Sequence, residues 1–285
     1  MSFFDRIAAV RQWDPEAFRP FVVEGRCVGR VRHATARALA DFPSVFHVAT
    51  DAVTLAPALA DVETRSRAVH EVVEELAARG DAPRPRGELY GVSETWAAPA
   101  LLRLDRGAVP LFGVKSYGAH VNGFVRRADG LAVWVGTRAA DKRVAPGKLD
   151  HLVAGGMAHG DSARATVIRE ADEEAGMSAE LADTAVPVGA LTYRCETEGG
   201  LRDDTLFIYD IELPESFVPE CRDGEIVRFD LVDVHEALAT ARDTDAFKFN
   251  VAVVMIDFFV RRGVISPDDE PRYPELLEAL HGAGA

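Results

Sequence analysis

The spacing of apolar residues predicts two successive folded segments in this chain. In the first segment, apolar residues alternate in stretches typical of strands and recur at helical spacing between them. The expected strands are Phe21–Val31, Phe46–Leu55 and Glu88–Thr95, and the expected helices are His33–Phe42 and Thr64–Arg79. This order predicts a small α/β or α+β domain over residues 1–110, with its boundary between Trp96 and Pro110.

The second segment, residues 111–285, has a longer series of strand-like stretches. The expected strands are His120–Arg126, Leu131–Thr137, Val186–Arg194, Thr205–Leu213 and Ile226–Val232. The first two are joined by Ala128-Asp129-Gly130, which is typical of a hairpin turn. A helix is expected at Phe247–Arg262, where core packing alone explains the apolar residues. The segment therefore predicts a larger α/β domain with C-terminal helices.

The most informative stretch lies between these strands, from Gly155 to Met177. Its second half has the periodicity of a helix, and Glu170, Glu173 and Glu174 fall on one face of it. The glycines before the helix favour a loop, and Asp161 or Ser162 is suited to the helix N-cap. Gly176 is suited to the left-handed residue that ends a helix.

Three carboxylates on one helical face repel one another unless a positive charge compensates them. Mg²⁺ and Mn²⁺ prefer carboxylate oxygen and keep waters or substrate phosphates as their other ligands. Arg169 stands beside the cluster and can hold one carboxylate by a forked hydrogen bond. The helix therefore predicts a site for a hard divalent cation.

The pattern G-x5-D-x7-R-E-A-x-E-E-x-G-M, from Gly155 to Met177, resembles the Nudix box. Asp161 stands where the family usually has Glu, and Ala171 is small for its apolar position. An ordinary solvated acidic helix is the alternative, but Arg169 and both flanking glycines in register favour the box. The resemblance implies a MutT-like hydrolase with a Nudix α/β/α sandwich and a mixed sheet, preceded by the small N-terminal domain.

The resemblance also implies roles for individual residues. Glu170, Glu173 and Glu174 are expected to bind the metal, and the carbonyl of Gly155 or Gly156 can complete its shell. The proton acceptor is expected to be Glu170, oriented by Arg169, or else Glu225, which precedes a strand as in many Nudix proteins. The reaction implied is attack of water on phosphorus in a diphosphate.

Several residues before the helix are candidates for contact with the substrate. Lys142 and Lys148 flank a Pro-Gly turn and can meet a phosphate as point charges. His120 and Asn122 lie on an expected strand beside the cleft, and Asp150 lies next to the box. Each of these residues has an ordinary alternative role in packing or at the surface.

The resemblance extends beyond the box to a particular branch of the family. The stretches LFGVKSYGAHVNGFV, DKRVAPGKLDHLVAGG, DGEIVRF and FKFNVAVVMIDFFVRRG occur in this order. Together they are similar to the Nudix branch related to thiamine pyrophosphokinase-associated hydrolases, which carry an N-terminal domain of this length. That likeness implies a small organic diphosphate as substrate, with thiamine diphosphate or its oxidised forms as candidates.

Two other functions are compatible with parts of the pattern. The PGKLDHLVAGG approach is loosely similar to isopentenyl-diphosphate isomerase, whose chemistry needs a Cys that this segment lacks. A Nudix domain kept as a ligand-binding regulator without turnover is the other alternative. The intact glutamate set favours the hydrolase over both.

The net charge, the cysteine count and the longest apolar run limit the expected partners and the expected cellular compartment. A net charge of −14 argues against a duplex nucleic-acid surface, but not against a phosphorylated small molecule. Three scattered cysteines predict reduced thiols and a cytoplasmic protein. The longest apolar run, Val251–Val260, contains Asp257 and is too short for a membrane span, so no membrane partner is expected. The oligomeric state is left open, with a homodimer as the candidate assembly.

Overall fold

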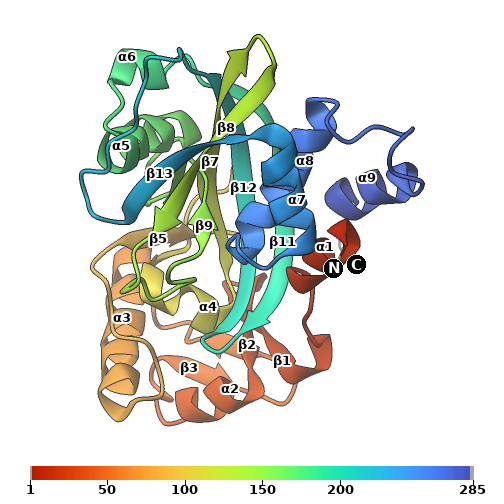
Figure 1. Cartoon of the computed structure of the whole chain (residues 1–285). Helices are drawn as coiled ribbons and strands as arrows, with labels where there is room; N and C mark the ends of the chain where they lie inside the picture. Colours follow the sequence, from red (N-terminus) through yellow and green to blue (C-terminus); the bar gives the residue numbers. More distant parts are fainter. Residues whose placement is uncertain (1, 283–285) are drawn as a thin grey trace.

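The computed structural model describes residues 2–282, within which two main sheets and a separate two-stranded sheet, residues 89–92 with 102–105, are packed with helices (Figure 1). The smaller sheet is built from the first part of the chain and has the strand order β2-β1-β4-β3. The larger sheet has the order β11-β12-β7-β8-β13, and β10 and β9 pair with β7 and β8. The pair β12–β7 is parallel and the others are antiparallel, so this sheet is mixed.

The N-terminal unit combines the small sheet and the two-stranded sheet with several helices. Its elements are α1 (Phe3–Ala9), η1 (Pro15–Ala17), β1 (Phe18–Val23), β2 (Arg26–Arg32), α2 (His33–Leu39), β3 (Phe46–Val48), β4 (Val53–Leu55), α3 (Val62–Arg79), β5 (Leu89–Val92), β6 (Leu102–Asp105), η2 (Arg106–Ala108) and α4 (Val109–Phe112). Helix α3 begins where the Asp61 carboxylate accepts from the Thr64 amide and ends at left-handed Gly80. Buried apolar residues from the sheet, α3 and α4 form one core.

The larger unit is a three-layer α/β/α sandwich with a mixed sheet, as the family resemblance implies. Its elements are β7 (Lys115–Arg127), β8 (Gly130–Arg138), β9 (Leu149–Asp150), β10 (Val153–Gly156), α5 (Ala163–Ala175), α6 (Ala179–Ala182), β11 (Val186–Thr197), β12 (Gly200–Glu212), β13 (Ile226–Asp233), α7 (Val234–Asp243), α8 (Phe249–Arg261) and α9 (Tyr273–His281). Helices α5 and α6 cover one face of the sheet, and α7 and α8 cover the other.

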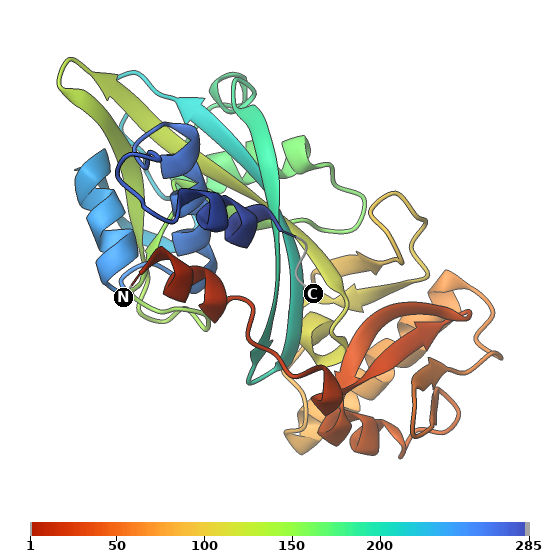
Figure 2. The same cartoon turned by 90° about the vertical axis from the view of Figure 1, so that its right-hand side faces the viewer.

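The two units touch along the long strands of the larger sheet. The β11–β12 hairpin reaches down to the N-terminal sheet (Figure 2), where the Arg32 guanidinium pairs with Glu196 at 3.1 Å. Left-handed Gly200 lies directly against the Pro110 carbonyl, where a Cβ would collide. Helix α1 crosses to the other unit and packs Phe3 and Ile7 into the core around α8.

Some expected elements differ from those observed. Phe46–Leu55 is a hairpin of two short strands, because the chain turns where the Ala49 amide donates to the Ala52 carbonyl. The glycines before the acidic helix do not form a loop throughout: Gly155 and Gly156 belong to β10. Strands β6, β9 and β10 and helix α9 were not expected, since they are short or lack a clear apolar period.

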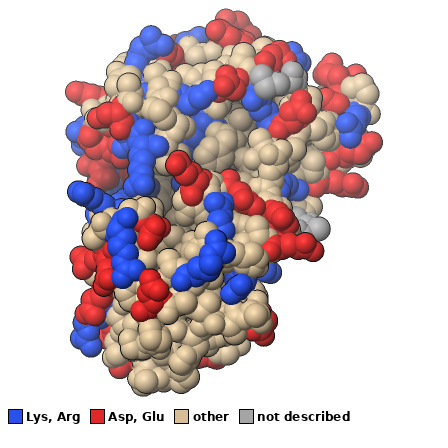
Figure 3. All heavy atoms as spheres, turned by 90° about the horizontal axis from the view of Figure 1, so that it is seen from below, with Lys and Arg blue, Asp and Glu red and all other residues tan. Residues whose placement is uncertain are grey.

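The charge distribution on the surface and the character of the helices are relevant to possible nucleic-acid and membrane partners. On the face seen from below, Lys and Arg side chains are interspersed with Asp and Glu (Figure 3). Among residues 2–282, the structure contains no helix with the length and apolar character needed to cross a bilayer.

Replacing Phe258 with alanine is expected to destabilise the fold. Its ring is fully buried and lies 5.9 Å from the Phe124 ring, centroid to centroid. Its loss should lower the free energy of unfolding by about 3–5 kcal/mol, from lost burial and the cavity left behind. Denaturant titration measures this change. The control Val218→Ala, at a residue 73% exposed, should stay within about 0.5 kcal/mol of wild type; equal stability of the two variants would contradict the assignment of this core.

Candidate active site

Helix α5 is fixed at both ends by residues of the acidic stretch. At its start, the Ser162 hydroxyl oxygen accepts from the Ala165 amide at 3.1 Å, so Ser162 rather than Asp161 is the N-cap. At its end, Gly176 adopts φ 62°, a left-handed conformation that glycine takes without strain. The register of the helix, and with it the direction of each carboxylate, is therefore set by local sequence.

The glycine pair of β10 allows other groups to approach the strand very closely. A Cβ at Gly155 would collide with the Glu170 side chain, and a Cβ at Gly156 would collide with the Tyr90 hydroxyl. Gly155 and Gly156 pair with Ala119 and Gly118 of β7. The acidic helix therefore packs on one side of β10, while a residue of the N-terminal unit packs on the other.

Arg169 collects several of the acidic residues. Its guanidinium lies 2.7 Å from a Glu170 oxygen, 3.3 Å from Glu173 and 3.7 Å from Asp161. It also donates to the Gly156 carbonyl at 3.4 Å. The shorter Asp161 thus still reaches Arg169, and Arg169 holds Glu170 against β10.

Glu174 points into a different group of carboxylates. It is 4% exposed and accepts a hydrogen bond from the Ala154 amide at 2.7 Å. Oxygens of Glu174, Asp223 and Glu225 all lie within 4.8 Å of one another. The structure therefore joins Glu225 to Glu174, as the family resemblance implies, and adds Asp223.

Asp223 was missed because its sequence context is that of an ordinary turn. Its carboxylate accepts from the Glu225 amide at 2.8 Å, which is the local bond expected of Asp before Gly. Only the packing of its segment brings it to α5: the Arg222 amide donates to the Glu173 carbonyl at 2.8 Å and the Glu220 amide to the Ala175 carbonyl at 3.1 Å. The turn thus satisfies the last carbonyls of α5 and places Asp223 beside Glu174.

The electrostatics of this group suit a hard cation. Burial raises the pKa of Glu174 well above its usual value, and the nearby charges of Asp150, Glu170 and Glu225 raise it further. Burial also raises the pKa of Glu170. Carboxylates that oppose one another's ionisation in this way are relieved by a divalent ion, and an all-oxygen set fits Mg²⁺ or Mn²⁺.

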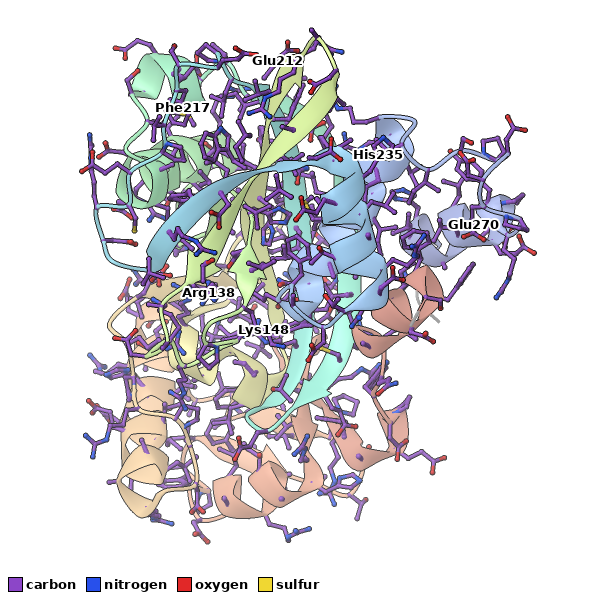
Figure 4. All side chains as sticks on the ribbon, in the orientation of Figure 1. Arg138, Lys148, Glu212, Phe217, His235 and Glu270 are labelled. Atoms are coloured by element: carbon purple, nitrogen blue, oxygen red, sulfur yellow. The ribbon has the colours of Figure 1, made fainter. Side chains whose placement is uncertain are left out.

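The two candidate lysines lie in different surroundings. Lys142 contacts Glu225 at 2.5 Å, so its charge adjoins the carboxylate group. Lys148 pairs instead with Asp245 at 2.9 Å. Figure 4 shows Lys148 near Arg138, whose amide donates to the Lys148 carbonyl.

The other three candidates for substrate contact are buried and have protein neighbours. Asp150 lies 2.6 Å from Arg138 and 3.3 Å from Lys248. Asn122 donates to Asp210 at 2.9 Å, and the His120 ring lies 5.0 Å from the His151 ring. Burial would raise the pKa of Asp150, but the charges around it, Lys248 first, lower it overall. These three side chains are buried among protein groups, and their contact with substrate stays a prediction.

Two surface hollows lie away from the carboxylates. One, of about 420 Å³, is bounded by β13 and α7 and includes Arg228, Glu236 and Phe247. The other, of about 310 Å³, is formed by residues around Phe46 in the N-terminal unit. Neither is lined by the acidic residues of α5, so the candidate site is defined by its chemistry rather than by cavity size.

Comparison with known proteins adds to this geometry. Residues 116–251 match the family model described as NUDIX domain, and residues 2–116 match the one described as Domain of unknown function (DUF4743). The chain is 39% identical over 290 residues to Nudix hydrolase 20, chloroplastic, of Arabidopsis thaliana, covering 98% of this chain and 77% of that protein. It is 41% identical over 265 residues to Nudix hydrolase 24, chloroplastic, of the same plant, covering 92% and 72%.

A solved structure with a similar arrangement is that of a C. elegans Ap4A hydrolase binary complex. The identity is 14%, the match covers 53% of this chain and 99% of that one, and the TM-score is 0.40.

The buried histidine beside Asp150 is expected to make stability depend on pH. Burial lowers the pKa of His151 to about 4, against 6.5 for a free histidine. As pH falls from about 6.5 to about 4, the unfolded chain binds a proton that the folded chain excludes. The free energy of unfolding should therefore fall by about 3 kcal/mol across this window.

Denaturant titrations at several pH values measure this slope. His151→Gln should flatten it, because glutamine does not titrate. Exposed His235, labelled in Figure 4, gives the matched control His235→Gln, which should keep the wild-type slope. Parallel curves for wild type and His151→Gln would contradict the prediction.

Proposed function

Because this chain belongs to the Nudix family and is a hydrolase acting on phosphorus anhydrides, we propose that it cleaves a small organic diphosphate with the help of Mg²⁺ or Mn²⁺. The observation that carries the proposal is the convergence of Glu174, Asp223 and Glu225 oxygens within 4.8 Å, beside a Glu170 held by Arg169. Two segments far apart in sequence supply this oxygen-rich group.

The metal ligands in this proposal come from both segments. Glu174 with Asp223 and Glu225 would hold the ion. Glu170 and Glu173, which Arg169 holds on α5, stay predicted ligands. The carbonyl of Gly155 remains a predicted further ligand. When bound, the ion neutralises phosphate charge and lowers the pKa of a coordinated water.

The chain's own residues would then move the proton. Water oxygen attacks phosphorus, the bridging P–O bond breaks, and the leaving phosphate takes the bond electrons. Glu170 is the proposed proton acceptor, because burial raises its pKa and Arg169 fixes its position at 2.7 Å. Glu225 is the second candidate, since it lies in the carboxylate group and is partly exposed.

Lys142 is the lysine proposed to meet the substrate. Its contact with Glu225 puts an ammonium beside the carboxylates, where a phosphate would replace Glu225 as its partner. Lys148 has an acidic partner, and His120, Asn122 and Asp150 are buried; contact of these four residues with substrate stays a prediction.

The organic part of the substrate is proposed from the closer family likeness. The four stretches shared with the thiamine pyrophosphokinase-associated branch favour thiamine diphosphate or its oxidised forms, with release of a monophosphate. A cytoplasmic location is proposed from the free thiols of Cys27, Cys195 and Cys221. The homodimer stays a prediction, as does the absence of nucleic-acid and membrane partners.

The alternative of a regulator without turnover is not favoured. It would need a domain that binds diphosphates but lacks the groups for hydrolysis. The presence of both a grouped carboxylate set and a separately held Glu170 favours the enzyme.

Removing a carboxylate from the converging group is expected to abolish most activity. With Mg²⁺ and thiamine diphosphate, oxidised thiamine diphosphate or another small diphosphate, wild type should release a monophosphate. Glu174→Gln and Asp223→Asn should each lower kcat at least about 100-fold, because the metal loses a charged ligand. A chelator should stop the reaction, and excess Mg²⁺ should restore it.

The control for these variants is Glu180→Gln, an exposed acid on neighbouring α6, which should keep wild-type kcat. Wild-type rates in Glu174→Gln would disprove the site. Binding of diphosphates without any release of phosphate by wild type would favour the regulator.

The pH dependence of kcat is expected to identify the proton acceptor. A carboxylate base works only when ionised, so the rate should fall as pH drops through the raised pKa of Glu170. Glu170→Gln should lower kcat by about 10²–10⁴-fold and remove this acidic limb. If the limb persists in Glu170→Gln and disappears in Glu225→Gln, the roles are reversed.

A further inference from the structure

The N-terminal unit reaches the strand that adjoins the acidic helix. The Leu89 carbonyl of β5 accepts from the His159 amide at 2.8 Å, and Tyr90 is buried against Gly156. A Cβ at Gly156 would lie 3.6 Å from the central carbon of the Arg106 guanidinium. Arg106 therefore stands beside the glycine pair, on the opposite side of β10 from Glu170.

A buried carboxylate holds two arginine-bearing segments together. Asp105, 3% exposed, accepts from the Arg86 amide at 2.9 Å, from Gly87 at 2.8 Å and from Gly107 at 2.7 Å. These bonds tie the loop that carries Arg86 to the turn that carries Arg106. Asp105 thereby positions both arginines but uses its oxygens on backbone amides.

The arginines near this loop and turn outnumber the carboxylates that form ion pairs with them. Arg106 pairs with Glu88 at 2.8 Å, and Arg202 pairs with Asp204 at 3.1 Å. Within residues 2–282, no carboxylate lies in ion-pairing distance of the Arg86 side chain, and the same holds for Arg143. Arg86 and Arg143 therefore keep charges that no acidic side chain of the described residues neutralises directly.

The arginine charges also act on one another. Partial burial, and then the charges of Arg106, Arg143 and Arg202, lower the pKa of Arg86. Such repulsion is relieved when an anion with several oxygens binds, since guanidinium groups recognise phosphate through paired hydrogen bonds. Arg143 follows Lys142, whose ammonium contacts Glu225, so the loop that carries Arg143 reaches the carboxylate group.

We propose that Arg86 and Arg106 of the N-terminal unit form an anion site for the substrate's phosphates beside the glycine pair of β10. The site rests on the proposed function, because it takes the same diphosphate that the carboxylate group cleaves. The N-terminal unit is thereby part of the active site, and Arg86 and Arg106 are binding residues of the enzyme.

The first test measures binding without catalysis. Inorganic pyrophosphate is titrated into the full-length protein by calorimetry, with a chelator present and at low salt. Arg86→Ala and Arg106→Ala should each weaken the pyrophosphate Kd by about 10- to 100-fold, as expected for loss of a charged hydrogen bond. Arg106→Lys should give an intermediate value, because it keeps the charge and loses the fork.

The matched control is Arg79→Ala. Arg79 lies on α3 of the same unit, its side chain is 39% exposed against 42% for Arg106, and it pairs with Asp41 and Glu75. Its removal should leave the pyrophosphate Kd unchanged. Thermal melting of every variant identifies loss of folding, and exposed Arg86 keeps the test valid if Arg106→Ala unfolds.

The second test uses turnover with Mg²⁺. In both alanine variants KM for the diphosphate substrate should rise at least about 10-fold while kcat changes much less, since binding rather than chemistry is altered. Unchanged Kd and KM in an active enzyme would overturn the anion site alone. A wild type that binds pyrophosphate through these arginines but hydrolyses no diphosphate would overturn the proposed function instead.

Discussion

The structure depends on two adjacent residues without side chains, Gly155 and Gly156. Because neither has a Cβ, Glu170 packs on one side of β10 and Tyr90 packs on the other. Residues with side chains at these two positions would push the acidic helix outward and displace the N-terminal unit. The close approach of three segments to one short strand places carboxylates and arginines around the same four residues of backbone.

Opposite charges then divide the site into two regions. Around α5, acids outnumber bases, and Arg169 and Lys142 offset only part of the charge. Around Arg86, basic side chains outnumber acidic ones. A metal–diphosphate complex carries both signs of charge, and it is complementary to such a pair of regions in a way that neither ion is alone.

The sequence was sufficient for features whose cause is local. The helix of the box follows from its periodicity, its cap and Gly176, and the resemblance located Glu225 beside it. Features that arise from tertiary contact could not be predicted. Asp223 has the pattern of a simple turn, and β10 is a strand only because β7 offers it an edge. His120 and Asn122 were placed on the correct strand, but alternation does not reveal that α8 covers that face.

The carboxylate group is assembled from α5 and from the turn before β13, with nearly fifty residues of chain between Glu174 and Asp223. An unfolded chain cannot keep such distant oxygens together, so it offers a divalent ion no comparable chelate. If the group binds the proposed ion, ion binding and folding are linked equilibria, and the ion also stabilises the native state. In a cell, depletion of divalent ions would then reduce the abundance of the folded enzyme as well as its turnover.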